Sequence, residues 1–144
     1  MVALHRQTIH SAILSLALTS AVAGCSSDEG GTTPGVNPAV VGTWNATSFV
    51  VGPDDLIALG MGMSFVFNND GTYSLNFTND QGGLCDPGEV NCSDSGTYTA
   101  SDTQILLDAG TVDSATLNYT ISGSTMTVTA TIDGSDITVV FDKA

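Results

Sequence analysis

Basic residues are nearly absent from this sequence. Lysine and arginine together number two in 144 residues, against 15 aspartates and glutamates. The arginine is Arg6, so from residue 25 onward only Lys143 faces all 15 acids, which gives these side chains a net charge of −14. Binding to nucleic-acid phosphates needs lysine or arginine, so the composition argues against a nucleic-acid partner. An acidic surface of this kind would suit a basic protein partner.

Histidine is missing from the same part of the chain, because His5 and His10 both precede it. A Ser-His-Asp or Cys-His pair and a histidine metal ligand therefore cannot form there. A pair of carboxylates could still act on a glycosidic bond. However, the acids fall mostly in expected turns and strand ends, where solvated carboxylates are ordinary. We predict that the protein is not an enzyme and has no catalytic residues, no cofactor and no metal site.

Long hydrophobic runs are also lacking. The longest, residues 11–23, has 13 residues, whereas a spanning helix needs about 20. A short N-terminal segment with Arg6 precedes this run and small residues follow it, which is typical of a secretory signal. Val22-Ala23-Gly24-Cys25 then resembles the lipobox of bacterial lipoproteins.

The lipoprotein resemblance implies a signal peptide over residues 1–24 that is cut before Cys25. It also implies that the Cys25 thiol carries a diacylglycerol and that the new amine is acylated, for example with palmitate. Two or three acyl chains hold a protein durably on a membrane. Ser26 follows the cysteine, and in this family a residue other than Asp there goes with the outer membrane. The expected location is therefore the cell envelope, with the outer membrane favoured. The alternative is an ordinary secretory signal and a free Cys25.

Residues 25–38 are expected to be the lipidated cysteine and a flexible linker, since they are rich in Gly, Ser, Thr and Pro without apolar periodicity. Residues 39–144 alternate apolar and polar residues almost throughout, which predicts one all-β domain. The clearest element is a hairpin with Asn69-Asp70-Gly71 at its turn. Pro53 is expected to open a short helical insertion after the first strand. The expected strands are 41–51, 63–68, 73–78, 96–99, 104–108, 115–121, 126–132 and 137–141.

About eight strands with one apolar face each predict an antiparallel up-and-down β-barrel, because closure removes the edges and buries the apolar face. A two-sheet β-sandwich is the alternative. The expected inward side chains are Trp44, Phe65, Phe67, Tyr73, Leu75, Phe77, Tyr98, Leu117, Tyr119, Ile121, Val128, Ile132, Val139 and Phe141.

Three motifs resemble the lipocalin-like domains of bacterial lipoproteins: Gly42-Thr43-Trp44 on the first strand, Phe67 to Tyr73 around the hairpin, and Gly96-Thr97-Tyr98. The resemblance covers nearly all of 39–144 and implies that Trp44 closes the floor of the barrel. The chain is shorter than a typical lipocalin. It also lacks the arginine that usually packs over this tryptophan from the last strand, unless Lys143 takes its place.

With Cys25 lipidated, Cys85 and Cys92 remain as an even pair, which predicts a disulfide in an exported protein. Asp86, Glu89, Asn91 and Asp94 cluster in and beside this loop, and whether they bind Ca²⁺ is left open.

The lipocalin resemblance implies a small hydrophobic ligand inside the barrel, and the lack of basic residues favours a neutral one. The expected ligand-binding residues are Trp44, Phe65, Phe67, Tyr73, Phe77, Leu117 and Tyr119. The alternative is a solid-core structural or protein-interaction lipoprotein, in which the same aromatics pack on each other. A continuous apolar cavity of roughly 300 Å³ or more would favour the ligand.

Overall fold

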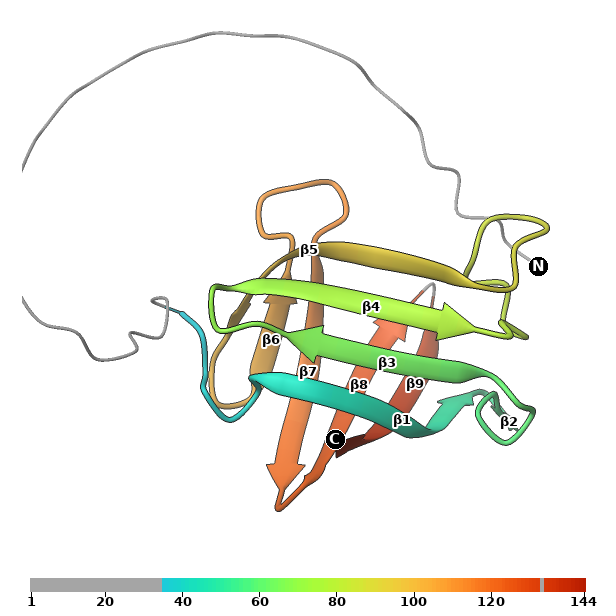
Figure 1. Cartoon of the computed structure of the whole chain (residues 1–144), viewed down its shortest axis with the longest axis horizontal. Helices are drawn as coiled ribbons and strands as arrows, with labels where there is room; N and C mark the ends of the chain where they lie inside the picture. The colour runs from blue at the N-terminus through green and yellow to red at the C-terminus, as the bar shows by residue number, and fades with distance from the viewer. Residues whose placement is uncertain (1–34, 133) are drawn as a thin grey trace, which may run out of the picture.

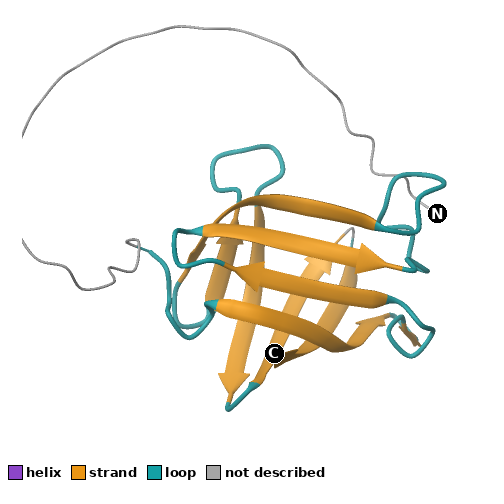
Figure 2. Ribbon diagram, viewed as in Figure 1, coloured by secondary structure: helices purple, strands orange, loops and turns teal. Residues whose placement is uncertain are grey.

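The computed structural model describes residues 35–132 and 134–144, so Cys25, the expected signal peptide and most of the linker lie outside the described residues. The described chain consists of strands, turns and loops, with no helix among them (Figure 2). The strands are β1 (Gly42–Val51), β2 (Asp54–Asp55), β3 (Gly62–Phe67), β4 (Thr72–Thr78), β5 (Cys92–Ala100), β6 (Gln104–Leu107), β7 (Ala115–Ser122), β8 (Thr125–Ile132) and β9 (Ser135–Lys143).

These strands form a closed antiparallel barrel. Each neighbour in the order β1-β3-β4-β5-β6-β7-β8-β9 is hydrogen-bonded to the next, and β9 pairs back with β1 from Trp44↔Lys143 to Val51↔Ile137. In Figure 1, β1, β3, β4 and β5 run across the front while β7, β8 and β9 cross behind them at a steep angle. The predicted all-β barrel is therefore confirmed, and the closing β1–β9 pairing decides against an open sandwich.

The predicted helical insertion after the first strand is wrong. Asp54 and Asp55 form the short strand β2 on the end of β1, and a turn then leads to β3. The Asp55 carboxylate explains this path, because it accepts hydrogen bonds from the backbone N–H groups of Phe49 and Ile57, both at 3.0 Å. The same carboxylate also accepts from the N–H of Ala58, so it caps a single turn that is not continued into a helix. Gly60, with φ of 101°, ends the turn in a conformation that few other residues adopt.

Asp55 makes the β2 turn sensitive to acid. The backbone N–H of Phe49 and the Ser48 hydroxyl hold the pKa of the Asp55 carboxyl below its ordinary value. Folding therefore favours the ionised form of Asp55. The contribution of this carboxylate to the free energy of unfolding is fully present above about pH 4, and it is lost as the pH falls through the lower pKa of the folded state. We expect Asp55→Asn to be less stable than wild type at neutral pH, with the difference shrinking below about pH 4. Urea unfolding of both proteins across that range would measure this, and a difference independent of pH would contradict it.

The hydrophobic core fills the interior of the barrel, between the front strands β1, β3, β4 and β5 and the strands β7, β8 and β9 behind them (Figure 1). Nine of the expected inward side chains are buried there: Trp44, Phe65, Phe67, Tyr73, Tyr98, Tyr119, Val128, Val139 and Phe141. Leu75, Phe77, Leu117 and Ile121 are half-buried against this core. The list of expected inward residues omits several that are buried, among them Phe49, Met61 and Ile105.

Candidate functional site

One end of the barrel, called the floor here, is closed by the segment 35–41, which runs into β1. Trp44 is completely buried at this end, and its indole N–H donates a 2.7 Å hydrogen bond to the carbonyl of Val40. Lys143, from the last strand, places its ammonium nitrogen 5.0 Å from the centre of the Trp44 ring. A cation at that distance from an indole face is attracted by the ring. The segment, the first strand and the last strand are thus joined at one side chain.

Aromatic rings fill the barrel above Trp44. Phe65 stacks on Phe67 with ring centres 4.4 Å apart and planes 8° apart. The same ring contacts Tyr73 at 5.6 Å and Phe141 at 6.3 Å, while Phe67 meets Tyr98 at 4.8 Å. These are the distances of favourable aromatic pairs. The aromatics expected to line a ligand cavity therefore contact one another in this half of the barrel.

The tyrosine hydroxyls at the floor are bonded to the loops. Tyr98 donates to the carbonyl of Asn68 at 2.9 Å, and burial together with the Asp70 carboxylate raises its pKa to about 12. Tyr119 accepts a 3.0 Å bond from the Asn37 amide and donates to the carbonyl of Ser101. Burial also raises the pKa of Tyr119, and the Asn37 bond partly offsets this. Both hydroxyls stay neutral at physiological pH, and their hydrogen bonds hold the loops against the floor of the barrel.

Tyr73 makes a different bond, across β5 to the end of β6. Its hydroxyl donates at 2.7 Å to Oδ2 of Asp108, while Oδ1 of the same carboxylate accepts a 2.9 Å bond from the backbone N–H of Thr97. Burial, followed by the Asp108 bond and the Asp94 charge, raises the pKa of Tyr73. The carboxylate lies directly over Gly96, where a Cβ would overlap it. The strands β5 and β6 share only the pairs from Tyr98↔Leu107 to Ala100↔Ile105. The bonds of the Asp108 carboxylate therefore lengthen a short pairing between these two strands, called the β5–β6 seam here.

The other end of the barrel, called the open end here, carries the loops 52–61, 79–91 and 108–114. Phe49 and Leu107 are buried near this end, but several other inward apolar side chains there are only half-buried. They include Met63, Phe77, Leu75, Leu117 and Ile137. Leu56 and Met61, from the turn after β2, are buried and cover part of this end. Asp94 lies opposite Leu75 in the β4–β5 pairing and is exposed, so the polar group bordering this apolar surface is an acid.

The long loop at the open end is tied by the predicted disulfide. Cys85 and Cys92 are bonded with their Cα atoms 5.7 Å apart. Asp80 supports the same loop, because its carboxylate accepts bonds from the backbone N–H groups of Gly82 at 2.8 Å and Cys85 at 2.7 Å. In the described residues, no three His, Cys, Asp or Glu side chains are placed together as metal ligands would be.

Loss of the disulfide is expected to destabilise the domain measurably. The chain-entropy relation gives about 2.5 kcal/mol for a loop of this length, so the Cys85→Ala/Cys92→Ala variant should unfold at a temperature lower by roughly 10 °C or more. Calorimetry of this variant beside wild type, each with and without a reductant, checks the prediction. The reductant should lower the melting temperature of wild type only, and an unchanged wild type would contradict the prediction.

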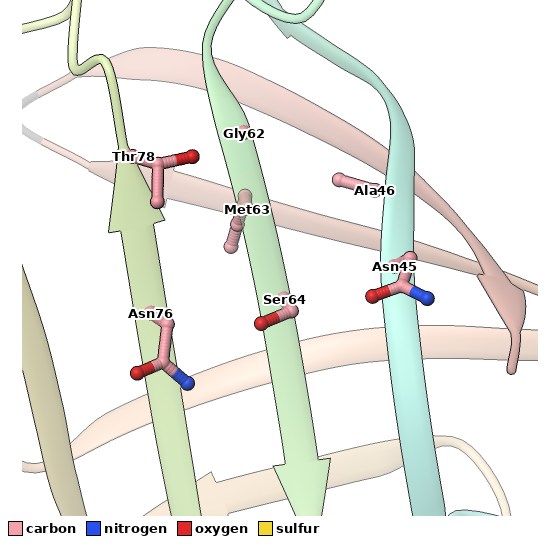
Figure 3. A pocket seen from close by; sticks show the side chains of 7 residues that line it. All are labelled: Asn45, Ala46, Gly62, Met63, Ser64, Asn76 and Thr78. Atoms are coloured by element: carbon pink, nitrogen blue, oxygen red, sulfur yellow. The ribbon is translucent and has the colours of Figure 1, made fainter. Parts of the chain in front are cut away.

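The hollows that we find in the described chain open on the outer wall of the barrel. One, of about 310 Å³, lies over β1, β3 and β4 and is shown in Figure 3. The second, of about 340 Å³, lies over β4 and β5. Of the expected ligand-binding residues, only Phe77 lines either of them.

The profile of the lipocalin-like domain family matches residues 40–128, more than half of the chain. The chain belongs to the lipocalin-like domain family. Among solved structures, fatty-acid-binding protein 1 of Echinococcus granulosus resembles it with a TM-score of 0.43 and 11% identity, over 74% of this chain and 98% of that one. No curated protein matches the chain at a significant level.

The floor differs at one position from what the lipocalin resemblance implies. Lys143 occupies the place over Trp44 where the lipocalin resemblance leads one to expect an arginine. The expected ligand-binding residues divide between the two ends. Trp44, Phe65, Phe67, Tyr73 and Tyr119 are buried in the packed part, whereas Phe77 and Leu117 are half-buried. Met63 at the open end was not among the expected residues, although its alternation with Phe65 and Phe67 could have indicated it.

No helix in the described residues has the length and hydropathy needed to cross a membrane.

Proposed function

We propose that this lipocalin-like domain binds the apolar part of a small, neutral ligand at its open end. The observation that carries the proposal is the contrast between the two ends of the barrel. Most inward apolar side chains at the floor are buried, whereas several at the open end, among them Met63, Phe77 and Leu117, are only half-buried. Apolar surface that faces a concave interior and remains partly wet gains free energy when a ligand covers it.

The charges around this end favour a neutral ligand over a fatty acid. Asp94 is exposed beside Leu75, and the Asp108 carboxylate is already bonded to Tyr73. The one lysine of the described chain, Lys143, lies at the floor over Trp44. A ligand carboxylate at the open end would therefore meet acids without a base to pair with, which is unfavourable in a partly buried site.

The proposal includes the anchor. Lipidation at Cys25, which lies outside the described residues, would hold the domain at a membrane of the cell envelope, with the outer membrane favoured by Ser26. The support comes from the lipobox resemblance of residues 22–25 and from the lipocalin-like domain that follows it. Mass spectrometry of the N-terminal peptide from the membrane fraction tests this. A diacylglyceryl Cys25 at the new N-terminus is expected, and an unmodified Cys25 in released protein would contradict the anchor.

The ligand itself is tested by native mass spectrometry of the full-length protein and two variants of β7. Leu117→Glu puts a carboxylate into the half-buried apolar surface, whereas Thr116→Glu adds the same charge on the exposed, outward face of the same strand. We expect wild type and Thr116→Glu to carry a discrete mass of a few hundred daltons. In Leu117→Glu the fraction of protein that carries this mass should fall by at least about 90%. A tenfold weaker affinity gives that fall when the free ligand concentration is well below the dissociation constant.

Two results would contradict the ligand proposal. One is wild-type protein that carries no ligand and also fails to bind any of a panel of neutral lipids. The other is equal ligand occupancy in Leu117→Glu and Thr116→Glu, since the ligand would then be bound elsewhere. Far-UV circular dichroism shows beforehand that both variants are folded.

A second function, binding of a basic protein, is favoured by the loops at the open end. Leu59, Leu84 and Val90 are about half exposed or more there, on two loops joined by a 2.9 Å bond from the Asn79 amide to the carbonyl of Gly60. Asp54, Asp86 and Glu89 are exposed on the same loops. Apolar side chains among acids would suit a basic partner with an apolar centre. Cross-linking in the envelope followed by capture should recover one basic protein, and Leu84→Asp should abolish the capture.

A further inference from the structure

The outer wall of the barrel carries a row of uncharged polar side chains that the proposed ligand site does not use. Asn45 on β1 pairs with Ser64 on β3, Ser64 pairs with Asn76 on β4, and Asn76 pairs with Ser93 on β5. These four residues, called the outer row here, alternate with inward neighbours such as Trp44 and Phe65. Figure 3 shows the first three side by side on neighbouring strands. With strands about 4.8 Å apart, the row crosses four strands at a regular spacing.

The two hollows of the outer wall lie along this row and share Asn76 and Thr78. Gly62 lets the Thr78 side chain lie close against β3, because a Cβ at this position would collide with the hydroxyl of Thr78. The second hollow continues past Asn91 and Ser93. The outer row therefore lies in a shallow groove that crosses β1, β3, β4 and β5.

The polar groups of the outer row are not used inside the protein. Within the described residues, the side chains of Asn45, Ser64, Asn76 and Ser93 form no hydrogen bond, although Ser64 and Asn76 are half-buried. An asparagine amide offers two donors and an acceptor, and a serine hydroxyl offers one donor and two acceptor positions. The groove thus presents alternating amides and hydroxyls that face outward, each able both to give and to accept a hydrogen bond.

Charge limits what can bind in the groove. No acidic or basic side chain lines either hollow, although the chain from residue 25 onward has a net charge of −14. An anionic ligand would be repelled by the surrounding field, and a cation would find stronger partners among the carboxylates elsewhere. A neutral ligand with many hydroxyl groups matches the groove, since each hydroxyl can pair with an amide or a hydroxyl of the row.

We propose that this groove binds a neutral oligosaccharide chain. Successive sugar rings would lie across successive strands, with their hydroxyls bonded to Asn45, Ser64, Asn76 and Ser93. The outer row lies on the opposite face of the β-sheet from inward residues such as Phe65, although Met63 and Phe77 of the proposed hydrophobic site also line the hollows. Leu117, which tests the hydrophobic ligand, lines neither hollow. Sugar binding of this open kind is weak, in the millimolar range that corresponds to about 4 kcal/mol.

NMR titration of the full-length protein with maltohexaose, cellohexaose and chitohexaose tests the proposal, because chemical shifts detect millimolar binding and locate it. We expect at least one of the three to shift backbone amides near the outer row on β1, β3, β4 and β5, with signals of the inward core unchanged. No saturable shift with any of these sugars, or shifts confined to another surface, would overturn it.

Two variants locate the binding. Asn76→Ala, at the point shared by both hollows, should weaken the affinity at least about fivefold, as loss of about 1 kcal/mol of hydrogen bonding gives. Asn118→Ala is the matched control, since Asn118 is an outward asparagine on β7 that pairs with Gln104 and Thr129 rather than with the groove. Equal affinities of both variants and wild type would overturn the assignment to this groove.

Discussion

Trp44→Ala is expected to remove a large part of the stability of this domain. The side chain is completely buried, bonded to Val40 and covered by Lys143, so its loss leaves a large cavity and breaks the connection between the N-terminal segment and both end strands. Truncation of a buried tryptophan typically costs about 3–5 kcal/mol. Small domains have roughly 5–15 kcal/mol in total. We expect the urea midpoint, followed by far-UV circular dichroism, to fall steeply.

Two further variants separate the causes of this loss. Trp44→Phe keeps an aromatic ring but removes the indole N–H, so it should lose less than Trp44→Ala. Lys143→Met keeps the apolar stem and removes the charge, and at an exposed site this cation–π contact is worth about 0.5–1 kcal/mol. Thr127→Ala on the outer side of β8 is a control that should change little. If Trp44→Ala unfolds at the same urea concentration as Thr127→Ala, the floor does not have the role assigned to it.

Gly96→Ala is expected to destabilise the barrel by about 3 kcal/mol or more. The new methyl group would occupy the place of the Asp108 carboxylate, which bonds Tyr73 and the backbone of Thr97. The carboxylate would have to move and leave the buried Tyr73 hydroxyl without a partner. Because β5 and β6 are paired over only three residues, the seam has few other bonds to compensate. Unfolding in urea measures the loss, with Ser95→Ala as the control on the same strand.

A double-mutant cycle with Asp108→Ala shows whether this explanation is right. Asp108→Ala alone should be destabilising, since it removes the same two bonds. Once the carboxylate is gone, adding Gly96→Ala should cost little more, so the two effects should not add. Additive losses would mean that Gly96 is needed for another reason.

Strand positions followed well from the sequence where alternation was strong. The hairpin of β3 and β4 was predicted from its aromatic alternation and from the Asn69-Asp70-Gly71 turn, and its register pairs Phe65 with Leu75. The start of β5 was predicted four residues too late, at Gly96 instead of Cys92. Residues 92–95 carry few apolar side chains, and they are held in the sheet by backbone pairing with β4, which leaves no hydrophobic pattern.

Other errors arose from local backbone chemistry. A bulge between Ala46 and Ser48 shifts the alternation of β1 by one residue. Phe49 is therefore buried, although strict alternation from Trp44 places it outside. The expected helix after Pro53 is absent because Asp54 and Asp55 pair with the end of β1 and Gly60, with a positive φ, ends the single turn that follows.

The candidate sites were partly accessible from the sequence. The aromatic residues were correctly expected inside, but their packing on one another depends on the dimensions of the barrel, which alternation does not specify. The outer row could not be foreseen, because it joins residues of four strands through pairings that only the fold determines. The Gly96–Asp108 contact likewise depends on the positive φ of Asp108, which is 45°.

The burial of Trp44 has a spectroscopic consequence. Trp44 is the only tryptophan of the chain, and it is completely shielded at the floor, seven residues along β1 from Val51. That separation is roughly 20 Å along a strand. Its fluorescence should therefore be emitted at short wavelength in the folded protein and shift to the red on unfolding. A ligand at the open end would leave the emission unchanged. Intrinsic fluorescence would therefore measure folding of this domain but would not detect binding of the ligand.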